Sequence, residues 1–266
     1  MKIGILTLRL FKNYGGILQN YALSRFLQKN GYDVETINIV WSYQLNGVKK
    51  YFVWLKRLVR NMLIGKWYSL DEEKILRNNE LVAAQRVNAF KEKNIPLSQK
   101  VYSLPGADFS DISNKYDTII VGSDQVWRPK YTGGIEKYFL SFADNRIKKI
   151  AYSASFGTDK NEYSFYEKWV CGKLIKRFDA ISVREESAIS LIREQLHWDV
   201  DVIQTLDPTM LLDITDYKSL VGQVVNNNKI FVYILDSSVQ KISFVEKLEK
   251  VLCMPCLLYT SPSPRD

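Results

Sequence analysis

Short apolar segments alternate along most of the chain with longer segments whose apolar residues recur at helical spacing. The first such unit is an apolar strand over Lys2–Leu8, a helix over about Ile17–Asn30 and a second strand over Asp33–Val40. Gly31 stands where glycine commonly ends a helix. This order and length are typical of a βαβ unit, in which the two strands run parallel.

The same alternation resumes further along the chain. Runs rich in β-branched and aromatic residues predict four more strands: Thr118–Val121, Lys149–Ser153, Asp179–Val183 and Asp201–Ile203. Helices are expected over about 164–176 and, after the strand Asp179–Val183, from about Arg184 to Gln195. The pattern predicts an α/β fold with a doubly wound, mostly parallel sheet. We therefore expect a Rossmann-like domain over residues 1–214 with a helical insertion over about 47–95.

Residues 215–252 are expected to form a linker and the start of a second α/β domain. Lys229–Leu235 (KIFVYIL) is a strongly apolar strand, Ser238–Leu252 has helical periodicity, and nothing after them completes a sheet. Residues 253–266 end in a proline-serine segment that resembles translated vector sequence, so we exclude them from the fold as a non-native tail. These features predict a chain that is truncated at its C-terminus.

The segment Gly47–Tyr68 differs from its surroundings. It holds six lysines and arginines among aromatic and aliphatic residues, and it has no acidic residue. As a helix it would present a basic face and an apolar face, which suits a peripheral membrane contact. A helix packed on the sheet, with its lysines in water, is the alternative.

The chain carries a net charge of +8 and a sequence pI near 9.2, which favours anionic partners without choosing among them. No signal peptide or membrane-spanning run is recognisable, so we expect a cytoplasmic protein, with peripheral contact at the inner face of the plasma membrane as an option. Three cysteines and the lone His197 give neither a disulfide framework nor metal-ligand spacing. No metal or cofactor is predicted, and no nucleic-acid recognition motif accompanies the basic residues.

Polar residues follow the strand Thr118–Val121 immediately. After Gly122 come three polar residues, and then a large aromatic and a cation: Ser123, Asp124, Gln125, Trp127 and Arg128. Ligands of open α/β sheets bind beyond the carboxyl ends of the strands. This segment is therefore a candidate pocket wall, with Trp127 as a stacking face for a sugar and Arg128 as an anion ligand.

The loop Arg9–Gly16 (RLFKNYGG) connects the first strand to the first helix. Backbone amides of a glycine turn and of a helix N-terminus favour bound anions. The loop lacks the GxGxxG pattern of dinucleotide-binding proteins. A tight turn without a ligand and a binding site remain equal alternatives here.

Five motifs occur in one order along the chain and resemble the polysaccharide pyruvyl transferase family. They are NYGGILQNYAL (Asn13–Leu23), VGSDQVW (Val121–Trp127), KIAYSASFG (Lys149–Gly157), SVRE (Ser182–Glu185) and LDPT (Leu206–Thr209). The resemblance implies a GT-B-like architecture of two domains with a site in the cleft between them. It also implies that phosphoenolpyruvate donates its enolpyruvyl carbons to sugar hydroxyls, forming a pyruvate ketal on a cell-surface glycan or its lipid-linked precursor.

Phosphoenolpyruvate carries a phosphate and a carboxylate, and arginine binds either group bidentately. Arg184 is our first choice for the donor, and by resemblance it matches the family's donor-site arginine; a surface ion pair with Glu185 or Glu186 is the alternative. We assign catalytic roles to Asp124 and Arg184. The candidate substrate-binding residues are Asn13, Gly15, Gly16, Ser123, Gln125, Trp127, Arg128 and Glu185. Asp124 would orient a hydroxyl, transfer a proton or cap its own loop, and Asp207 is expected to fix the turn between domains.

The sequence departs from the family pattern in one respect. By resemblance, the second domain should carry a late Ser-Phe-His-Gly-like motif whose histidine is the acid-base group, and nothing here matches it. We interpret His197 as a partly exposed structural histidine and expect the chain to be inactive alone. Two alternatives stay open: a GT-B glycosyltransferase using a nucleotide sugar, and a non-catalytic membrane- or glycan-associated protein.

Overall fold

The computed structural model describes residues 1–11, 13–41, 85–103, 109, 112, 114–221, 228–234 and 238–260. The chain divides into two compact units, Met1–Asp213 and Ile214–Asp266. The basic segment 47–68 lies outside the described residues, and so does most of the expected insertion. The described part of the expected insertion is α4 (Gln85–Asn94), after which Ile95 and Pro96 lead toward the sheet.

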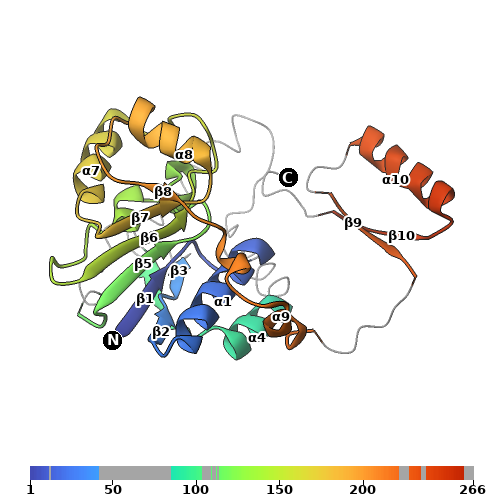
Figure 1. The fold of residues 1–266 in the computed structure, drawn as a ribbon, viewed down its shortest axis with the longest axis horizontal. Helices are drawn as coiled ribbons and strands as arrows, with labels where there is room; N and C mark the ends of the chain where they lie inside the picture. Colours follow the sequence, from blue (N-terminus) through green and yellow to red (C-terminus); the bar gives the residue numbers. More distant parts are fainter. Residues whose placement is uncertain are drawn as a thin grey trace, which may run out of the picture. The chain divides into compact units, whose positions relative to one another are not determined.

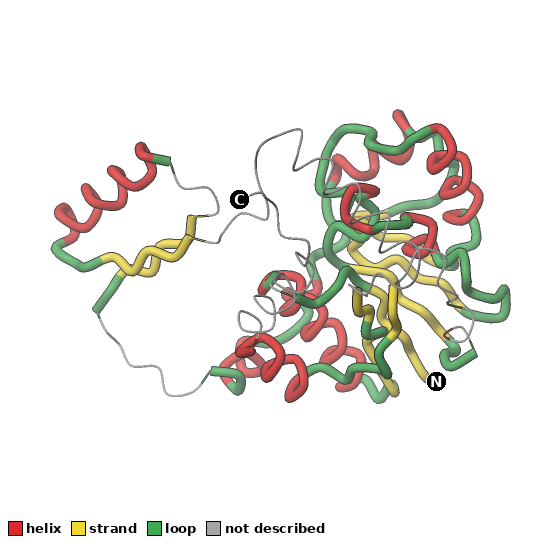
Figure 2. Tube along the Cα trace, turned by 180° about the vertical axis from the view of Figure 1, so that it is seen from behind, coloured by secondary structure: helices red, strands yellow, loops and turns green. Residues whose placement is uncertain are grey.

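Unit 1 is built on a six-stranded, fully parallel sheet in the order β2-β1-β5-β6-β7-β8 (Figures 1 and 2). The strands are β1 (Lys2–Leu6), β2 (Asp33–Thr36), β5 (Thr118–Gly122), β6 (Lys148–Ala154), β7 (Ala180–Val183) and β8 (Ile203–Gln204). The predicted α/β class with a mostly parallel sheet is thus confirmed. The expected single strand Asp33–Val40 is instead two strands, because β3 (Ile39–Trp41) leaves the main sheet to pair with β4 (Val101–Ser103).

Helices cover both faces of this sheet, as the apolar runs of its strands require. α1 (Tyr14–Lys29) places Leu23 and Leu27 against Ile3 and Ile5 of β1 on one face. The other face carries a larger core that includes residues of four further elements: η1 (Ile135–Phe139), α7 (Phe165–Ile175), α8 (Glu186–Ser190) and the π-helical turn η2 (Leu191–Gln195). A short helix, α6 (Pro129–Thr132), precedes η1, and η3 (Pro208–Met210) follows β8.

Unit 2 contains α9 (Ile214–Lys218), β9 (Ile230–Ile234), α10 (Val239–Leu252) and β10 (Cys256–Thr260). β9 and β10 pair in parallel with Ile230 opposite Cys256, so residues 230–260 form a second βαβ unit. For residues 256–260 this corrects the sequence analysis, which excluded residues 253–266 from the fold. The run CLLYT pairs because its apolar and aromatic residues suit a strand, although the proline-serine sequence begins directly after it.

Candidate active site

The order of the strands defines where a ligand is expected. From β1 the chain crosses to β2 on one side, whereas from β5 it proceeds to β6, β7 and β8 on the other side. The topological switch point therefore lies between β1 and β5, and ligands of doubly wound sheets bind at the carboxyl ends of the strands there. The N-terminus of α1 and the loop that follows Gly122 are the two segments at this point.

Asp124 is the buried carboxylate of the switch point. It has a backbone φ of 75°, a left-handed conformation that aspartate tolerates better than most residues. One carboxylate oxygen accepts a hydrogen bond from the backbone N–H of Gln125 at 2.8 Å, and the other accepts from Nδ2 of Asn13 at 3.2 Å. Asn13 in turn caps α1 by accepting from the N–H of Gly16 at 3.1 Å. The carboxylate of Asp124 thus links the loop after Gly122 to the N-terminus of α1.

Burial raises the pKa of Asp124. The hydrogen bond from the Gln125 N–H and the positive charge of Arg184 lower this pKa in part, while the nearby carboxylate of Asp207 raises it. A carboxyl group whose pKa is moved toward neutral pH is better suited to proton transfer than an exposed one. Asp124 therefore has the environment of an acid-base residue as well as that of a loop cap.

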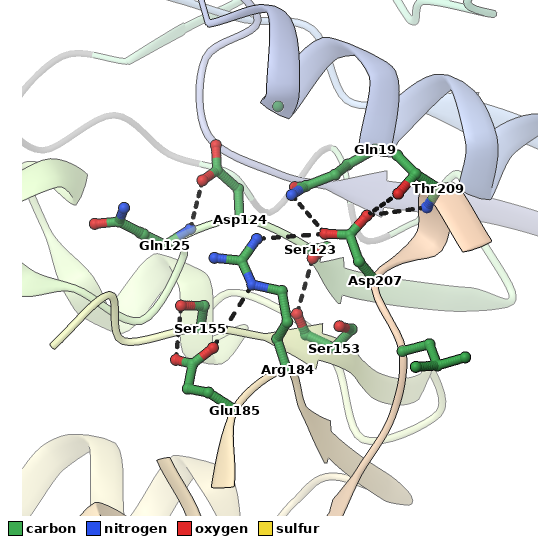
Figure 3. A network of polar contacts seen from close by, with 12 residues as sticks. Gln19, Ser123, Asp124, Gln125, Ser153, Ser155, Arg184, Glu185, Asp207 and Thr209 are labelled. Carbon is green, nitrogen blue, oxygen red and sulfur yellow. Dashed lines mark hydrogen bonds and ion pairs between the residues drawn. The ribbon is translucent and has the colours of Figure 1, made fainter. Parts of the chain in front are cut away.

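Arg184 lies at the end of β7, with its backbone N–H bonded to the carbonyl oxygen of Ala154 at 3.1 Å. Its guanidinium is held by two carboxylates, but loosely: Nε is 3.6 Å from Glu185 and Nη1 is 3.4 Å from Asp207 (Figure 3). Charge-assisted hydrogen bonds are normally about 2.7–2.9 Å long. Nη2 makes no hydrogen bond to any described residue, and the side chain is 28% exposed.

Both of these carboxylates have shorter hydrogen bonds to other groups. Glu185 accepts from Oγ of Ser155 at 2.7 Å. Asp207 accepts from Nε2 of Gln19 at 2.7 Å through one oxygen and from Oγ1 of Thr209 at 2.7 Å through the other (Figure 3). The carboxylates therefore orient Arg184 without saturating it, which leaves guanidinium N–H groups for an anionic ligand.

Arg128 shows the opposite arrangement. Its Nε and Nη2 donate to the two oxygens of Glu162, both at 3.0 Å, and its Nη1 donates to Oε1 of Gln125 at 3.1 Å. The two bonds from Arg128 to Glu162, with a further one from Lys130, lower the pKa of Glu162 to about 2. The predicted anion-binding role of Arg128 does not fit this geometry, because its donors are already used within the protein.

Trp127 also differs from the sequence-based expectation. It is fully buried, stacks on Phe139 at a centroid distance of 5.0 Å and contacts Phe156 at 5.6 Å. Its indole N–H donates to the carbonyl oxygen of Tyr138. No ring face is open to a sugar, so the predicted stacking role is wrong and Trp127 is a core residue.

Two other candidates contribute less than predicted. Ser123 is buried, and its hydroxyl donates to the carbonyl oxygen of Ser153 at 2.9 Å. The side chain of Gln125 points away from Arg184 toward Arg128, and only its backbone N–H supports Asp124 (Figure 3).

His197 is exposed just after η2, outside the site.

Sequence reasoning missed two residues that complete the cluster. Gln19 lies one turn inside α1, and Asp207, which was expected only to fix a turn, bonds both Gln19 and Arg184. Gln19 belongs to the motif NYGGILQNYAL and Asp207 to the motif LDPT, so membership of these motifs was the sequence signal that could have identified them. Among the described residues, no group of three or more His, Cys, Asp or Glu side chains is placed to hold a metal ion. No helix of the described residues is long and apolar enough to cross a membrane.

The parallel sheet and its strand order are those of a GT-B-like fold. Three solved structures of an alpha-glucosyltransferase are similar to the chain. One, in complex with UDP and a 13-mer DNA, has a TM-score of 0.52, 14% identity and coverage of 95% of this chain and 55% of that chain. A second, with UDP, has a TM-score of 0.51, 12% identity and coverage of 99% and 59%. A third, with UDP-glucose and DNA containing an abasic site, has a TM-score of 0.53, 14% identity and coverage of 99% and 58%.

These identities support the shared fold alone, and the chain spans between 55% and 59% of the length of these structures. The family follows from the sequence itself. The family model for polysaccharide pyruvyl transferase matches residues 13–252, and the chain belongs to this family. Among curated proteins, no match is found.

Proposed function

We propose that this protein takes part in transfer of the enolpyruvyl group of phosphoenolpyruvate to sugar hydroxyls of a cell-surface polysaccharide or its precursor. The family membership supports a pyruvyl transfer reaction. The observation that carries the choice of donor is the loosely held guanidinium of Arg184 at the same sheet edge as Asp124. A planar cation with unused donors matches a carboxylate or phosphate, both of which this donor has.

A proton on one carboxyl group reduces the negative charge around Arg184, although the cluster as a whole stays negative. Three carboxylates, Asp124, Glu185 and Asp207, lie near one arginine. With all three ionised the cluster is negative, but burial already raises the pKa of Asp124. A bound donor raises it further by repulsion between like charges. Asp124 is therefore the carboxyl group of this cluster that donor binding favours in its protonated form, and the N-terminus of α1 adds the positive end of its helix dipole.

The proposed reaction balances in atoms and protons when Asp124 transfers the protons and Arg184 binds the donor. Protonated Asp124 delivers its proton to the methylene carbon of the donor, and the first sugar hydroxyl attacks the neighbouring carbon. The proton of that hydroxyl returns to the carboxylate of Asp124. A second hydroxyl of the same sugar then displaces phosphate, which leaves with the remaining proton, and a pyruvate ketal results. Arg184 stabilises the anionic groups of the donor throughout.

Titration calorimetry with the chain tests the choice of donor. Phosphoenolpyruvate should release or absorb heat with a saturable isotherm, whereas UDP-glucose and other nucleotide sugars should not. Saturable binding of a nucleotide sugar without binding of phosphoenolpyruvate would instead establish the glycosyltransferase alternative.

Asp124 should make donor binding depend on pH. Because donor binding favours the protonated form of Asp124, the affinity should fall as pH rises above the pKa of Asp124 in the free protein, by up to about tenfold per pH unit. Asp124→Asn removes this titration, so the ratio of variant to wild-type affinity should rise with pH. The ionisation of the donor itself is common to both proteins and cancels in the ratio. A pH-independent ratio would show that Asp124 does not titrate with binding.

Gly16 should be required for the position of Asp124. A Cβ on Gly16 would lie 2.7 Å from Oδ2 of Asp124 and 3.2 Å from Nδ2 of Asn13, which forces the carboxylate to move. Gly16→Ala should therefore weaken donor binding by roughly tenfold, since small displacements at a site have large effects. Gly15→Ala is the matched control, because its Cβ meets only Oδ1 of Asn13 at 3.3 Å. Calorimetry of both variants makes the comparison, and equal affinities would contradict the packing argument.

A further inference from the structure

The first two turns of α7 expose three aromatic side chains. Phe165 is 89% exposed, Tyr166 is 70% exposed and Trp169 is 54% exposed. Lys173 and Lys176 are exposed further along the helix. The intervals from Phe165 of one, four, eight and eleven residues place all five side chains on one helical face. We call these five residues the α7 face.

The fold does not need this face to be aromatic. α7 is fixed by its opposite side, where Cys171 and Ile175 are fully buried in the larger core. Its N-terminus has a complete capping box between Ser164 and Glu167. The three aromatic side chains therefore add little burial to unit 1, and a protein surface rarely gathers such residues without a binding role.

The charges on the α7 face favour an anionic partner. The ammonium group of Lys173 lies 3.7 Å from the ring centroid of Trp169, and Lys176 follows on the same face. The acidic residue of α7, Glu167, accepts hydrogen bonds from both the backbone N–H and the hydroxyl of Ser164. Aromatic rings beside lysines are the combination that suits the boundary between lipid headgroups and acyl chains.

The topology places the aromatic part of this face at the functional edge of the sheet. α7 follows β6, and in a parallel α/β unit the connecting helix begins at the carboxyl ends of the strands. Asp124 follows the carboxyl end of β5 and Arg184 follows that of β7, so both lie at that same edge (Figure 3). A surface that contacts Phe165, Tyr166 and Trp169 would therefore lie beside the edge where the site opens.

We propose that the α7 face docks unit 1 on an anionic lipid bilayer, with the three aromatic side chains in the headgroup region and the two lysines against lipid phosphates. This orientation brings a membrane-held sugar acceptor to the carboxyl edge of the sheet. The docking itself requires neither the donor nor Arg184, so its test is independent of the proposed reaction.

Vesicle flotation tests the proposal with the whole chain. The protein should float with vesicles containing phosphatidylcholine and phosphatidylglycerol at 7:3 and remain unbound with phosphatidylcholine alone. The triple variant Phe165→Ala, Tyr166→Ala, Trp169→Ala should reduce the bound fraction at least tenfold, and so should Lys173→Glu with Lys176→Glu. The double variant Lys115→Glu with Lys148→Glu makes the same change in charge at the start of β5 and β6, on the opposite sheet edge, and should bind better than the α7 double variant.

Quenching by brominated lipids adds a readout specific to this helix. Trp169 should be quenched on binding, and Trp169→Phe should lose that quenching while keeping most of the binding. The proposal is overturned if the triple variant binds the vesicles as the wild type does, which would place the contact elsewhere in the chain. It is equally overturned if sedimentation velocity without vesicles shows that the α7 face instead joins two copies of the protein.

Discussion

Replacement of Arg184 by alanine is expected to weaken phosphoenolpyruvate binding by roughly 100-fold. The guanidinium has one nitrogen without a described partner and two at long distances, 3.6 Å to Glu185 and 3.4 Å to Asp207. A hydrogen bond to a charged group contributes about 1.5–3 kcal/mol, and a bidentate contact makes two of them. Removing the side chain also leaves three carboxylates without their common cation, so repulsion of the anionic donor adds to the loss. Titration calorimetry at constant pH and salt measures the change.

Arg184→Lys separates charge from geometry. Lysine keeps the positive charge but lacks the planar fork, so it should recover part of the affinity and remain about tenfold weaker than the wild type. Arg146→Ala is the matched control: this arginine is 80% exposed and pairs with Asp144 at the surface. If Arg184→Ala and Arg146→Ala bound the donor equally well, the assignment of Arg184 as the donor ligand would be wrong.

The periodicity of the sequence was sufficient for the strands of the six-stranded sheet and for the edge at which polar residues gather, but not for β3, β4 and β10. Each predicted strand of the six-stranded sheet reappears within a few residues, and the central strands do so because a strand buried on both faces must be a short apolar run. The partners of Arg184 were harder to find. Asp207 and Gln19 are 188 positions apart and meet only because the strand order brings the ends of β1, β7 and β8 to one edge. The local periodicity of a sequence does not determine the order of the strands in the sheet.

Trp127 and Arg128 show a second limit of local reasoning. Both follow a strand end, where aromatic and cationic side chains often bind ligands, and both are used internally instead. The packing partners that decide this come from distant segments: Phe139 from η1, and Glu162 from the loop before α7. A motif indicates which residues lie together at a site. Which of them turn outward depends on how the rest of the chain covers them.

The burial of Trp127 leads to a large effect on stability. Trp127 is fully buried, its ring stacks on Phe139, and its N–H satisfies the carbonyl oxygen of Tyr138. Truncation of a buried tryptophan leaves a cavity and an unpaired carbonyl group. Trp127→Ala should therefore lower the free energy of unfolding by about 3–5 kcal/mol.

Trp169→Ala is the control within the same protein, because it removes a tryptophan that is 54% exposed. Surface substitutions usually change stability by less than about 0.5 kcal/mol, so urea unfolding followed by circular dichroism should separate the two variants clearly. Trp127→Phe keeps most of the ring volume and should retain donor binding, since no face of Trp127 is open to a ligand. Loss of donor binding in a stably folded Trp127→Phe protein would restore the stacking role that the packing around this ring argues against.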